Sequence, residues 1–442
     1  MLKKSVFSRF GTGAVSTFPG TASATGMSDM IERLRIDRLG AQGDGIAETA
    51  QGPVYVPFAL AGETVSAEIR GQRAQMVQVE EASPLRVQPV CAHFGQCGGC
   101  SIQHLAVEAY AAWKREKVVR ALELSGVEAE VGELVTCPPA TRRRVALSAR
   151  KAVGTVLLGF NAAMSHDIVE IRDCAVAVPE IVAALGDLRE LAGVLATGPK
   201  PIRLTVTATR TGLDIAADGV GRVDEGRRRG LVELCLGRRF ARLSVDGEII
   251  IERKKPVVMF GDVPVVIPPG GFLQATEQAE AVMAALVTEH LAGAKFVADL
   301  FAGSGTFALR LARQSRVHAA ESEARALTAL DEAARHAPGL KPVSVEKRDL
   351  FRRPLLPKEL AAFDGLVFDP PRAGAEAQSE QIAKSEVRKV AAVSCNPGTL
   401  ARDLAILAKG GYRIVRVVPV DQFLWSAHVE AVALLEKPRR RG

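Results

Sequence analysis

The sequence has no uninterrupted apolar run long enough to cross a bilayer, although 48% of its 442 residues are hydrophobic. That absence argues against a membrane protein. Cysteine is also scarce, and seven cysteines at uneven spacing do not predict a disulfide framework. Residues 1–29 lack the apolar centre of a secretory signal. Together these absences predict a soluble globular protein, of about two or three domains at this length.

The N-terminal segment also lacks acidic residues before Asp29. Residues 1–29 predict a disordered leader or a start codon set too far upstream, because Met27 or Met30 would begin the folded part cleanly. Over the whole chain, 57 Lys and Arg exceed 50 Asp and Glu, which gives a formal charge of +7. The basic residues are bunched in the runs Arg142-Arg143-Arg144, Arg227-Arg228-Arg229, Arg238-Arg239 and Arg253-Lys254-Lys255. This balance favours a polyanionic partner.

Three regions follow the N-terminal segment. Residues 30–89 contain short runs of period two separated by glycines, which predict a small antiparallel β-barrel. Residues 90–268 carry several cysteines and then strands with one helix near residues 179–195, which predicts an α+β region. Residues 269–442 alternate strand and helix, which predicts an α/β domain with a mostly parallel sheet. Ligands bind such sheets at the carboxyl ends of the strands.

A glycine-rich turn, Asp299 to Gly305, joins a predicted strand to a helix. There Phe301, Gly303 and their neighbours are expected to bring the backbone close to a nucleotide. Glu321 ends the next predicted strand, where a carboxylate accepts both hydroxyls of a ribose, and Asp349 ends the third, where it is expected to meet the adenine edge. The turn reads Gly-x-Gly-Thr rather than Gly-x-Gly-x-x-Gly, so S-adenosylmethionine is the predicted cofactor and NAD the alternative.

Two further turns carry candidate catalytic residues. Asp369 lies in a rigid Asp-Pro-Pro-Arg turn, of the kind that base-modifying methyltransferases need to read a flipped base. Cys395 ends an apolar run at a turn, where a nucleophile would be displayed. Carbon 5 of uracil is too weak a nucleophile to take a methyl group from a sulfonium, but thiolate addition at carbon 6 makes an enolate that can. Glu430, at the start of the last predicted strand, is the candidate base for the hydrogen at carbon 5.

Four cysteines are the candidate metal ligands: Cys91, Cys97, Cys100 and Cys174. The first three have the close spacing of a metal site, and Gly98 and Gly99 let the chain fold around it. Zinc and an iron–sulfur cluster both accept four thiolates, so the spacing leaves both open.

At these residues the sequence resembles the cluster-containing 5-methyluridine RNA methyltransferases, especially those acting on bacterial large-subunit ribosomal RNA. The resemblance runs from about residue 31 to the end of the chain. It is carried by Cys91 to Cys100, Phe272-Leu273-Gln274, Asp299 to Gly305, Asp369 to Gly374, Ser394 to Pro397 and His428-Val429-Glu430. The sequence departs from the family at Ala302, where cysteine is frequent, and at Ala333, where asparagine is common. Neither residue touches the expected chemistry.

The resemblance implies an N-terminal TRAM barrel, a central domain with a [4Fe-4S] cluster, and a Rossmann-like domain that binds S-adenosylmethionine. Carried onto matching positions, it makes Cys395 the nucleophile, Glu430 the base and Asp369 a group contacting the uracil. Gln274, the glycine turn and Glu321 would hold the cofactor. The implied partner is RNA, most of all 23S ribosomal RNA, in the bacterial cytoplasm, with no membrane and no obligate protein partner.

Three alternatives remain open. One is a transfer-RNA uracil-5-methyltransferase, although that branch of the family usually lacks the four cluster cysteines. Another is an RNA amino-group methyltransferase, since acidic Asp-Pro-Pro turns also serve nitrogen chemistry and need no cysteine. The third is a non-enzymatic RNA-binding iron–sulfur protein. The cluster itself is expected to be structural and to help dock RNA, because transfer of a methyl cation needs no electron.

Overall fold

The computed structural model describes residues 31–152, 154–238 and 240–438, so the predicted leader and Arg239 lie outside it. The chain divides into two compact units, the first ending at Arg86 and the second beginning at Val87. Among the helices of the described ranges, none is long and apolar enough to cross a membrane.

The first unit is a six-stranded sheet with the strand order β1-β5-β6-β4-β3-β2. Its strands are β1 (Ile31–Arg35), β2 (Arg38–Leu39), β3 (Gly45–Thr49), β4 (Gly52–Val56), β5 (Thr64–Arg70) and β6 (Arg73–Glu81). Neighbouring strands are antiparallel except for β4 and β6. Alternate residues such as Val54 and Val56, or Val65 and Ala67, form its small core, as the period-two pattern predicts.

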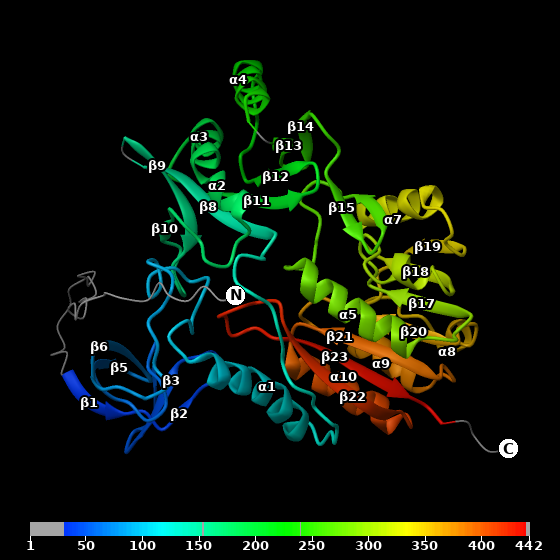
Figure 1. Cartoon of the computed structure of the whole chain (residues 1–442), viewed down its shortest axis with the longest axis horizontal. Helices are drawn as coiled ribbons and strands as arrows, with labels where there is room; N and C mark the ends of the chain where they lie inside the picture. Colours follow the sequence, from blue (N-terminus) through cyan, green and yellow to red (C-terminus); the bar gives the residue numbers. More distant parts are fainter. Residues whose placement is uncertain (1–30, 153, 239, 439–442) are drawn as a thin grey trace, which may run out of the picture. The chain divides into compact units, whose positions relative to one another are not determined.

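The second unit begins with α1 (Val107–Leu124) and contains a seven-stranded sheet of order β10-β9-β8-β11-β12-β13-β14. The strands of this sheet are β8 (Arg144–Ala152), β9 (Thr155–Asn161), β10 (Ile168–Glu170), β11 (Ile202–Thr209), β12 (Gly212–Asp218), β13 (Phe240–Val245) and β14 (Glu248–Glu252). Three helices pack on it, α2 (Pro179–Ala183), α3 (Leu185–Leu195) and α4 (Glu225–Leu236) (Figure 1). The helix predicted near residues 179–195 is thus divided at Ala184.

A hairpin of β15 (Val257–Phe260) and β16 (Val263–Val266) leads to an eight-stranded sheet of order β19-β18-β17-β20-β21-β23-β22-β7. Its strands are β7 (Val135–Thr136), β17 (Phe296–Leu300), β18 (Arg316–Glu321), β19 (Val343–Lys347), β20 (Gly365–Phe368), β21 (Lys389–Ser394), β22 (Arg413–Asp421) and β23 (Glu430–Glu436). Strands β17 to β21 are parallel, whereas β23 runs antiparallel between β21 and β22. The carboxyl ends of β17–β22 and the amino end of β23 therefore meet at one edge.

Helices cover both faces of this sheet, because successive strand residues point to opposite sides. On β17, Val297 packs with α5 (Glu277–His290), α6 (Ala308–Leu311) and α7 (Ala324–His336). Ala298 and Leu300 belong to the opposite core, which also contains residues of α1. The other helices of that face are α8 (Pro357–Leu360), α9 (Glu376–Ala383) and α10 (Pro397–Lys409) (Figure 1). The predicted α/β domain with a mostly parallel sheet is confirmed.

Candidate active site

A cavity of about 470 Å³ opens at the carboxyl edge of the eight-stranded sheet. The predicted site residues that line it are Gln274, Phe301, Gly303, Glu321, Asp349, Asp369, Cys395 and Glu430. Residues separated by more than 150 positions in the sequence are thereby brought into one space, as the rule for strand ends predicts. Asp299 and Gly305, also predicted to bind the cofactor, are described by the structure but do not line the cavity.

The glycine turn has an unusual backbone that shapes one wall of the cavity. Phe301, Gly303 and Gly305 all have positive φ, of 61°, 53° and 100°. At Phe301 this conformation is strained, as residues at ligand sites often are. Gly305 has a packing role, because a Cβ there would lie 2.4 Å from Cδ1 of Leu330 on α7. It therefore lets helix and turn approach each other rather than facing a ligand.

Glu321 is held in place by its own turn and by the glycine turn. Its Oε2 accepts a hydrogen bond from the Gly303 amide at 3.1 Å. Its Oε1 accepts from the amides of Ser322 at 2.6 Å and Glu323 at 2.9 Å. The carboxylate thus joins the ends of β17 and β18.

Asp299 differs from the other acidic residues because it is fully buried within β17. Its carboxyl oxygens have no hydrogen-bond partner at normal distance among the described residues. Burial raises the pKa of this carboxyl group well above its usual value, and the charges of Asp369 and Glu321 add to the effect. Asp299 is buried and does not line the cavity, so its effect on a ligand there would be indirect.

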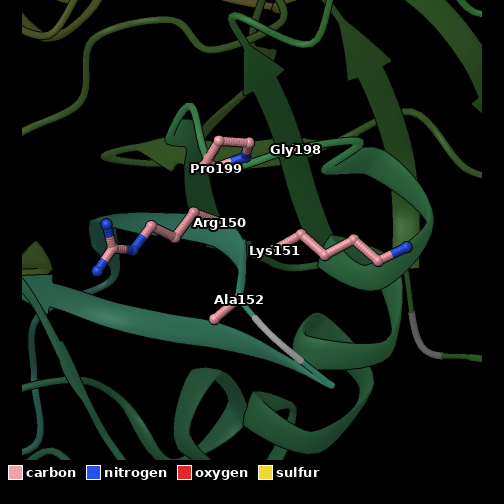
Figure 2. A pocket seen from close by; sticks show the side chains of 5 residues that line it. All are labelled: Arg150, Lys151, Ala152, Gly198 and Pro199. Carbon is pink, nitrogen blue, oxygen red and sulfur yellow. The ribbon is translucent and has the colours of Figure 1, made fainter.

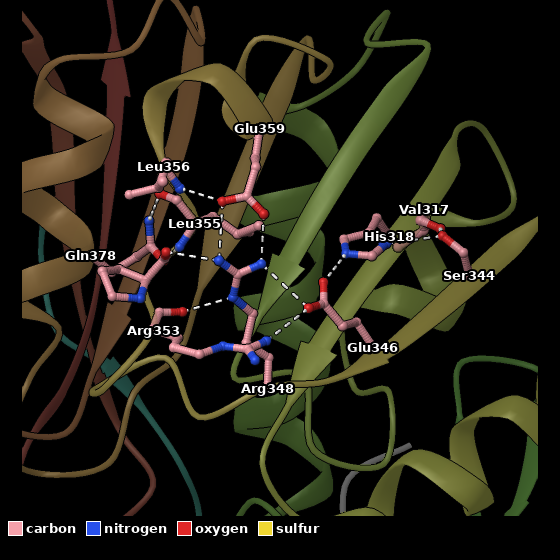
Figure 3. A network of polar contacts seen from close by, with 11 residues as sticks. Val317, His318, Ser344, Glu346, Arg348, Arg353, Leu355, Leu356, Glu359 and Gln378 are labelled. Carbon is pink, nitrogen blue, oxygen red and sulfur yellow. Dashed lines mark hydrogen bonds and ion pairs between the residues drawn. The ribbon is translucent and has the colours of Figure 1, made fainter.

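The loop after β19 is organised by Arg348, at the centre of the polar network in Figure 3. Its guanidinium group binds Glu359 through Nη1 at 2.7 Å and Nη2 at 3.0 Å, and also donates to the carbonyls of Arg353 and Pro354. Asp349, the next residue, accepts from the amide of Phe351 at 3.0 Å. These contacts fix the loop that carries Asp349 at the cavity wall.

Cys395 lies between the end of β21 and the start of α10. Asn396 caps that helix through the Gly398 amide at 3.1 Å. Its Nδ2 also donates to the Arg372 carbonyl at 3.2 Å, which ties the Asp369 turn to the cysteine turn. The pKa of the Cys395 thiol is raised to about 11, first by burial and then by the charges of Glu430 and Asp369.

A chain of side-chain hydrogen bonds links the two carboxylates of the cavity. Gln274 donates from Nε2 to Oδ2 of Asp369 at 2.9 Å. Gln422 donates from Nε2 to Oε1 of Gln274 at 2.8 Å and to Oε2 of Glu430 at 2.5 Å. Burial raises the pKa of Asp369 and of Glu430, and the charge of Asp369 raises that of Glu430 further. At neutral pH the pair therefore resists carrying two negative charges.

Gln422 was missed by the sequence analysis, although a signal was present. It directly follows β22, which runs parallel to β21, so the rule for strand ends applied to it as well. The predicted residues at strand ends were acidic residues, glycines and Cys395, so the side-chain amide of Gln422 was not among them.

The loop after β22 is clamped by α1. Asp421 forms a buried ion pair with Lys114 and accepts from the Tyr110 hydroxyl at 2.6 Å. Lys114 Nζ also donates to the carbonyl of Phe423 at 2.9 Å. The residues on both sides of Gln422 are thus fixed by one helix. In addition, the Trp425 carbonyl accepts hydrogen bonds from the amides of Ser101 at 2.9 Å and Ile102 at 3.1 Å, which directly follow Cys100.

The four predicted metal ligands are neighbours within the second unit. Burial and the charges of Cys174, Cys97 and Cys91 raise the pKa of Cys100 to about 12. The sulfur of Cys97 accepts from the Gly99 amide at 3.4 Å. Within the described ranges, however, no group of three or more His, Cys, Asp or Glu side chains is arranged to hold a metal ion.

Several of the basic runs have structural partners. Arg143 forms a buried ion pair with Glu280 and donates from Nε to the Gln274 carbonyl at 3.2 Å. Arg228 pairs with Glu248. Arg142 instead stacks its guanidinium group 5.7 Å from the ring of Phe423 at the cavity. Part of the positive charge therefore serves the fold and only part is available to a polyanion.

A second hollow, of about 540 Å³, lies on the seven-stranded sheet. It is lined by Arg150, Lys151, Ala152, Gly198 and Pro199. Figure 2 shows that the side chains of Arg150 and Lys151 extend away from each other. No charged groups converge there, so the chemistry is assigned to the cavity at the strand ends.

Comparison with known proteins matches these residues to a family. Residues 268–438 fit the family model described as tRNA (Uracil-5-)-methyltransferase. An RNA methyltransferase of Brucella suis is 57% identical over 95% of this chain and 100% of its own length. One of Mesorhizobium japonicum is 58% identical over 93% of this chain and 100% of its own.

A relative of defined target is more distant. The 23S rRNA (uracil(1939)-C(5))-methyltransferase RlmD of Chromohalobacter salexigens is 34% identical over 95% of this chain and 92% of its own length. The solved structure of the tRNA (uracil-54, C5)-methyltransferase of Pyrococcus abyssi with S-adenosyl-L-homocysteine has the same fold, with a TM-score of 0.71 at 24% identity. It covers 91% of this chain and 100% of its own. The chain belongs to the family of S-adenosylmethionine-dependent RNA uracil-5-methyltransferases.

Proposed function

We propose that this enzyme methylates carbon 5 of one uridine in 23S ribosomal RNA, with Cys395 as a covalent nucleophile. The observation that carries the proposal is the meeting of Cys395, Glu430 and Asp369 with the glycine turn in one cavity. An amino-group methyltransferase needs the turn and the aspartate, but it has no use for a thiol and a second carboxylate beside them.

The proposed reaction begins with the Cys395 thiolate adding to carbon 6 of a uracil held out of its stack. The electron pair displaced onto carbon 5 makes that carbon nucleophilic. Bound S-adenosylmethionine supplies an electrophilic methyl group to carbon 5. Asp369, oriented by Gln274, is suited to hold the uracil edge. Glu430 then removes the hydrogen of carbon 5, and the thiolate leaves.

The cofactor fits the other half of the cavity. Glu321 is proposed to accept the ribose hydroxyls, with its orientation already fixed by three backbone amides. Asp349 is proposed to meet the adenine edge beside the rings of Phe301 and Phe351, whose centroids are 5.4 Å apart. Gln274 would face the end of the cofactor that carries the methyl group.

We extend the proposal to a [4Fe-4S] cluster held by Cys91, Cys97, Cys100 and Cys174. The donor set suits it, because burial raises the pKa values of Cys97, Cys100 and Cys174 and a bound cation would stabilise their thiolates, and the Gly99 amide already donates to the sulfur of Cys97. Among the described residues, the side chains of these cysteines are not arranged to hold a metal ion. Iron and sulfide analysis of protein purified without oxygen tests the assignment.

For the RNA, we propose that the six-stranded first unit is a TRAM barrel that binds the substrate. Support for 23S ribosomal RNA comes from the relative in Chromohalobacter salexigens, a 23S rRNA (uracil(1939)-C(5))-methyltransferase that aligns with 95% of this chain. Transfer RNA is the alternative substrate; the Pyrococcus abyssi protein that acts on it is 24% identical and shares the fold. The site itself does not distinguish the two, because both contain uridines in folded loops.

The test is methylation in vitro of 23S ribosomal RNA and of transfer RNA from cells lacking the gene, with 5-methyluridine measured by mass spectrometry. We expect one new 5-methyluridine in 23S ribosomal RNA. Cys395→Ala abolishes it, whereas Cys235→Ala, at a buried cysteine of α4, leaves it intact. Methylation confined to transfer RNA would overturn the target. A methylated amino group, or normal activity of Cys395→Ala, would overturn the mechanism.

A further inference from the structure

Gln422 occupies a position that constrains its amide completely. Its Oε1 accepts from the Ala275 amide at 2.8 Å, so Nε2 must face the cavity. Both Nε2 hydrogens are used there, one by Gln274 and the other by Glu430. Gln422 and Glu430 are each 2% exposed, so water does not replace these contacts easily.

The carboxyl group of Glu430 depends on this single donor. Oε2 receives the Gln422 hydrogen bond at 2.5 Å, while Oε1 has no hydrogen-bond partner among the described residues. Because Oε2 is anchored, Oε1 is the atom left to receive a proton from the cavity. The hydrogen bond also favours the ionised carboxylate, in opposition to burial and to the charge of Asp369.

We propose that Gln422 is a positioning residue for proton removal, which holds Glu430 Oε2 so that Oε1 takes the hydrogen from carbon 5 of the methylated uracil. This rests on the proposed function of Cys395 and Glu430. In that step the C5–H bond breaks and its proton passes to Oε1. The electron pair forms the C5–C6 double bond, the C6–S bond breaks, and its pair returns to the sulfur of Cys395.

The position predicts an effect on one step only. Gln422 does not contact Cys395 by any hydrogen bond that the structure describes, and it takes no direct part in the hydrogen bond from Gln274 to Asp369. Thiolate addition and methyl transfer should therefore continue without it. Proton removal slows, because Glu430 loses the contact that orients it and keeps it ionised. The methylated covalent complex between enzyme and RNA then accumulates.

The test compares Gln422→Met with the wild type and with Gln314→Met, a half-buried glutamine whose amide donates to the Thr288 carbonyl away from the cavity. Methyl transfer is followed with labelled S-adenosylmethionine, and proton removal by tritium release from RNA containing 5-tritiated uridine. The covalent complex is measured on denaturing gels. Wild-type enzyme with 5-fluorouridine RNA reports separately whether Cys395 forms the adduct at all.

We expect Gln422→Met to release tritium about 10 to 100 times more slowly, the range that loss of one hydrogen bond to a charged group produces. The methylated adduct accumulates in this variant and not in Gln314→Met. In a Glu430→Gln background, Gln422→Met slows release no further, because it acts through the base. The role of Gln422 is overturned if Gln422→Met releases tritium at the wild-type rate and accumulates no adduct. It is also overturned if this variant slows methyl transfer and tritium release equally. Failure of wild-type enzyme to trap 5-fluorouridine RNA overturns the proposed function instead.

Discussion

Alkylation of Cys395 in the free enzyme tests the electrostatics of the cavity directly. The thiol has its pKa raised from 9.0 to about 11, first by burial and then by Glu430 and Asp369. A shift of this size leaves about 100-fold fewer thiolates at pH 7. The more basic thiolate reacts faster by about tenfold, so we expect alkylation about tenfold slower than at a thiol of pKa 9.0. A raised thiol pKa means that reactivity keeps rising with pH up to about 11.

The assay is alkylation by iodoacetamide between pH 6.5 and 10, quantified on one peptide. Trypsin releases residues 390–402 as a fragment that contains Cys395 as its sole cysteine. The variant Glu430→Gln removes one of the two charges, and Glu430 is ionised wherever Cys395 titrates because its own raised pKa lies lower. Glu436→Gln, at the other end of β23, is the matched control.

We expect the alkylation profile of Glu430→Gln to move to lower pH, but only part of the way toward that of a free thiol, because burial is the larger cause. Glu436→Gln should leave the profile unchanged. A wild-type plateau at pH 9 or below would refute the reasoning, since it would mean that the cavity stabilises the thiolate.

Three further predictions concern binding and stability. Arg348→Met should weaken S-adenosyl-L-homocysteine binding about 10-fold or more in calorimetry, because the loop of Asp349 loses its anchor to Glu359. Lys114→Met should cost about 3–5 kcal/mol in urea unfolding, since it leaves the Asp421 carboxylate buried without its cation. Gly305→Ala should lower stability by about 1–3 kcal/mol in the same assay, because its Cβ meets α7 and its φ is positive.

Each of these changes has a matched control in the described chain. For Arg348 the control is Arg335→Met, and for Lys114 it is Arg120→Met. Each control breaks an exposed ion pair on a helix, so it should change the free energy measured in its assay, of binding or of unfolding, by less than about 1 kcal/mol. For Gly305 it is Gly293→Ala, at a positive φ with open space around it. If a control matched its test variant, the stated contact would not be the cause.

Most of the catalytic edge could be predicted because its residues follow strands whose apolar patterns are long and distinct. The glycine turn was predicted to follow a strand, and β17 indeed ends there, at Leu300. Asp349 was expected at a strand end but lies two residues beyond β19, in a loop whose course depends on Arg348. Contacts of that kind join side chains distant in sequence and leave no local pattern.

Local sequence patterns also did not predict that residues before 269 contribute to the eight-stranded sheet and its packing. Strand β7 adds to its edge, and α1 packs on α10 and β22. A two-residue strand has no periodicity to detect, and an apolar helix face does not specify its partner. Gln422 was missed for a different reason, since its importance depends on which way an amide points.

The antiparallel strand β23 has one more consequence. It is hydrogen-bonded along both sides, by β21 and by β22, and Glu430 is its first residue. Amide hydrogens in such a strand exchange with solvent only when much of the sheet opens. Glu430 is therefore attached to what should be one of the slowest-exchanging parts of the fold. On heating, the alignment of Glu430 should persist until the sheet itself unfolds.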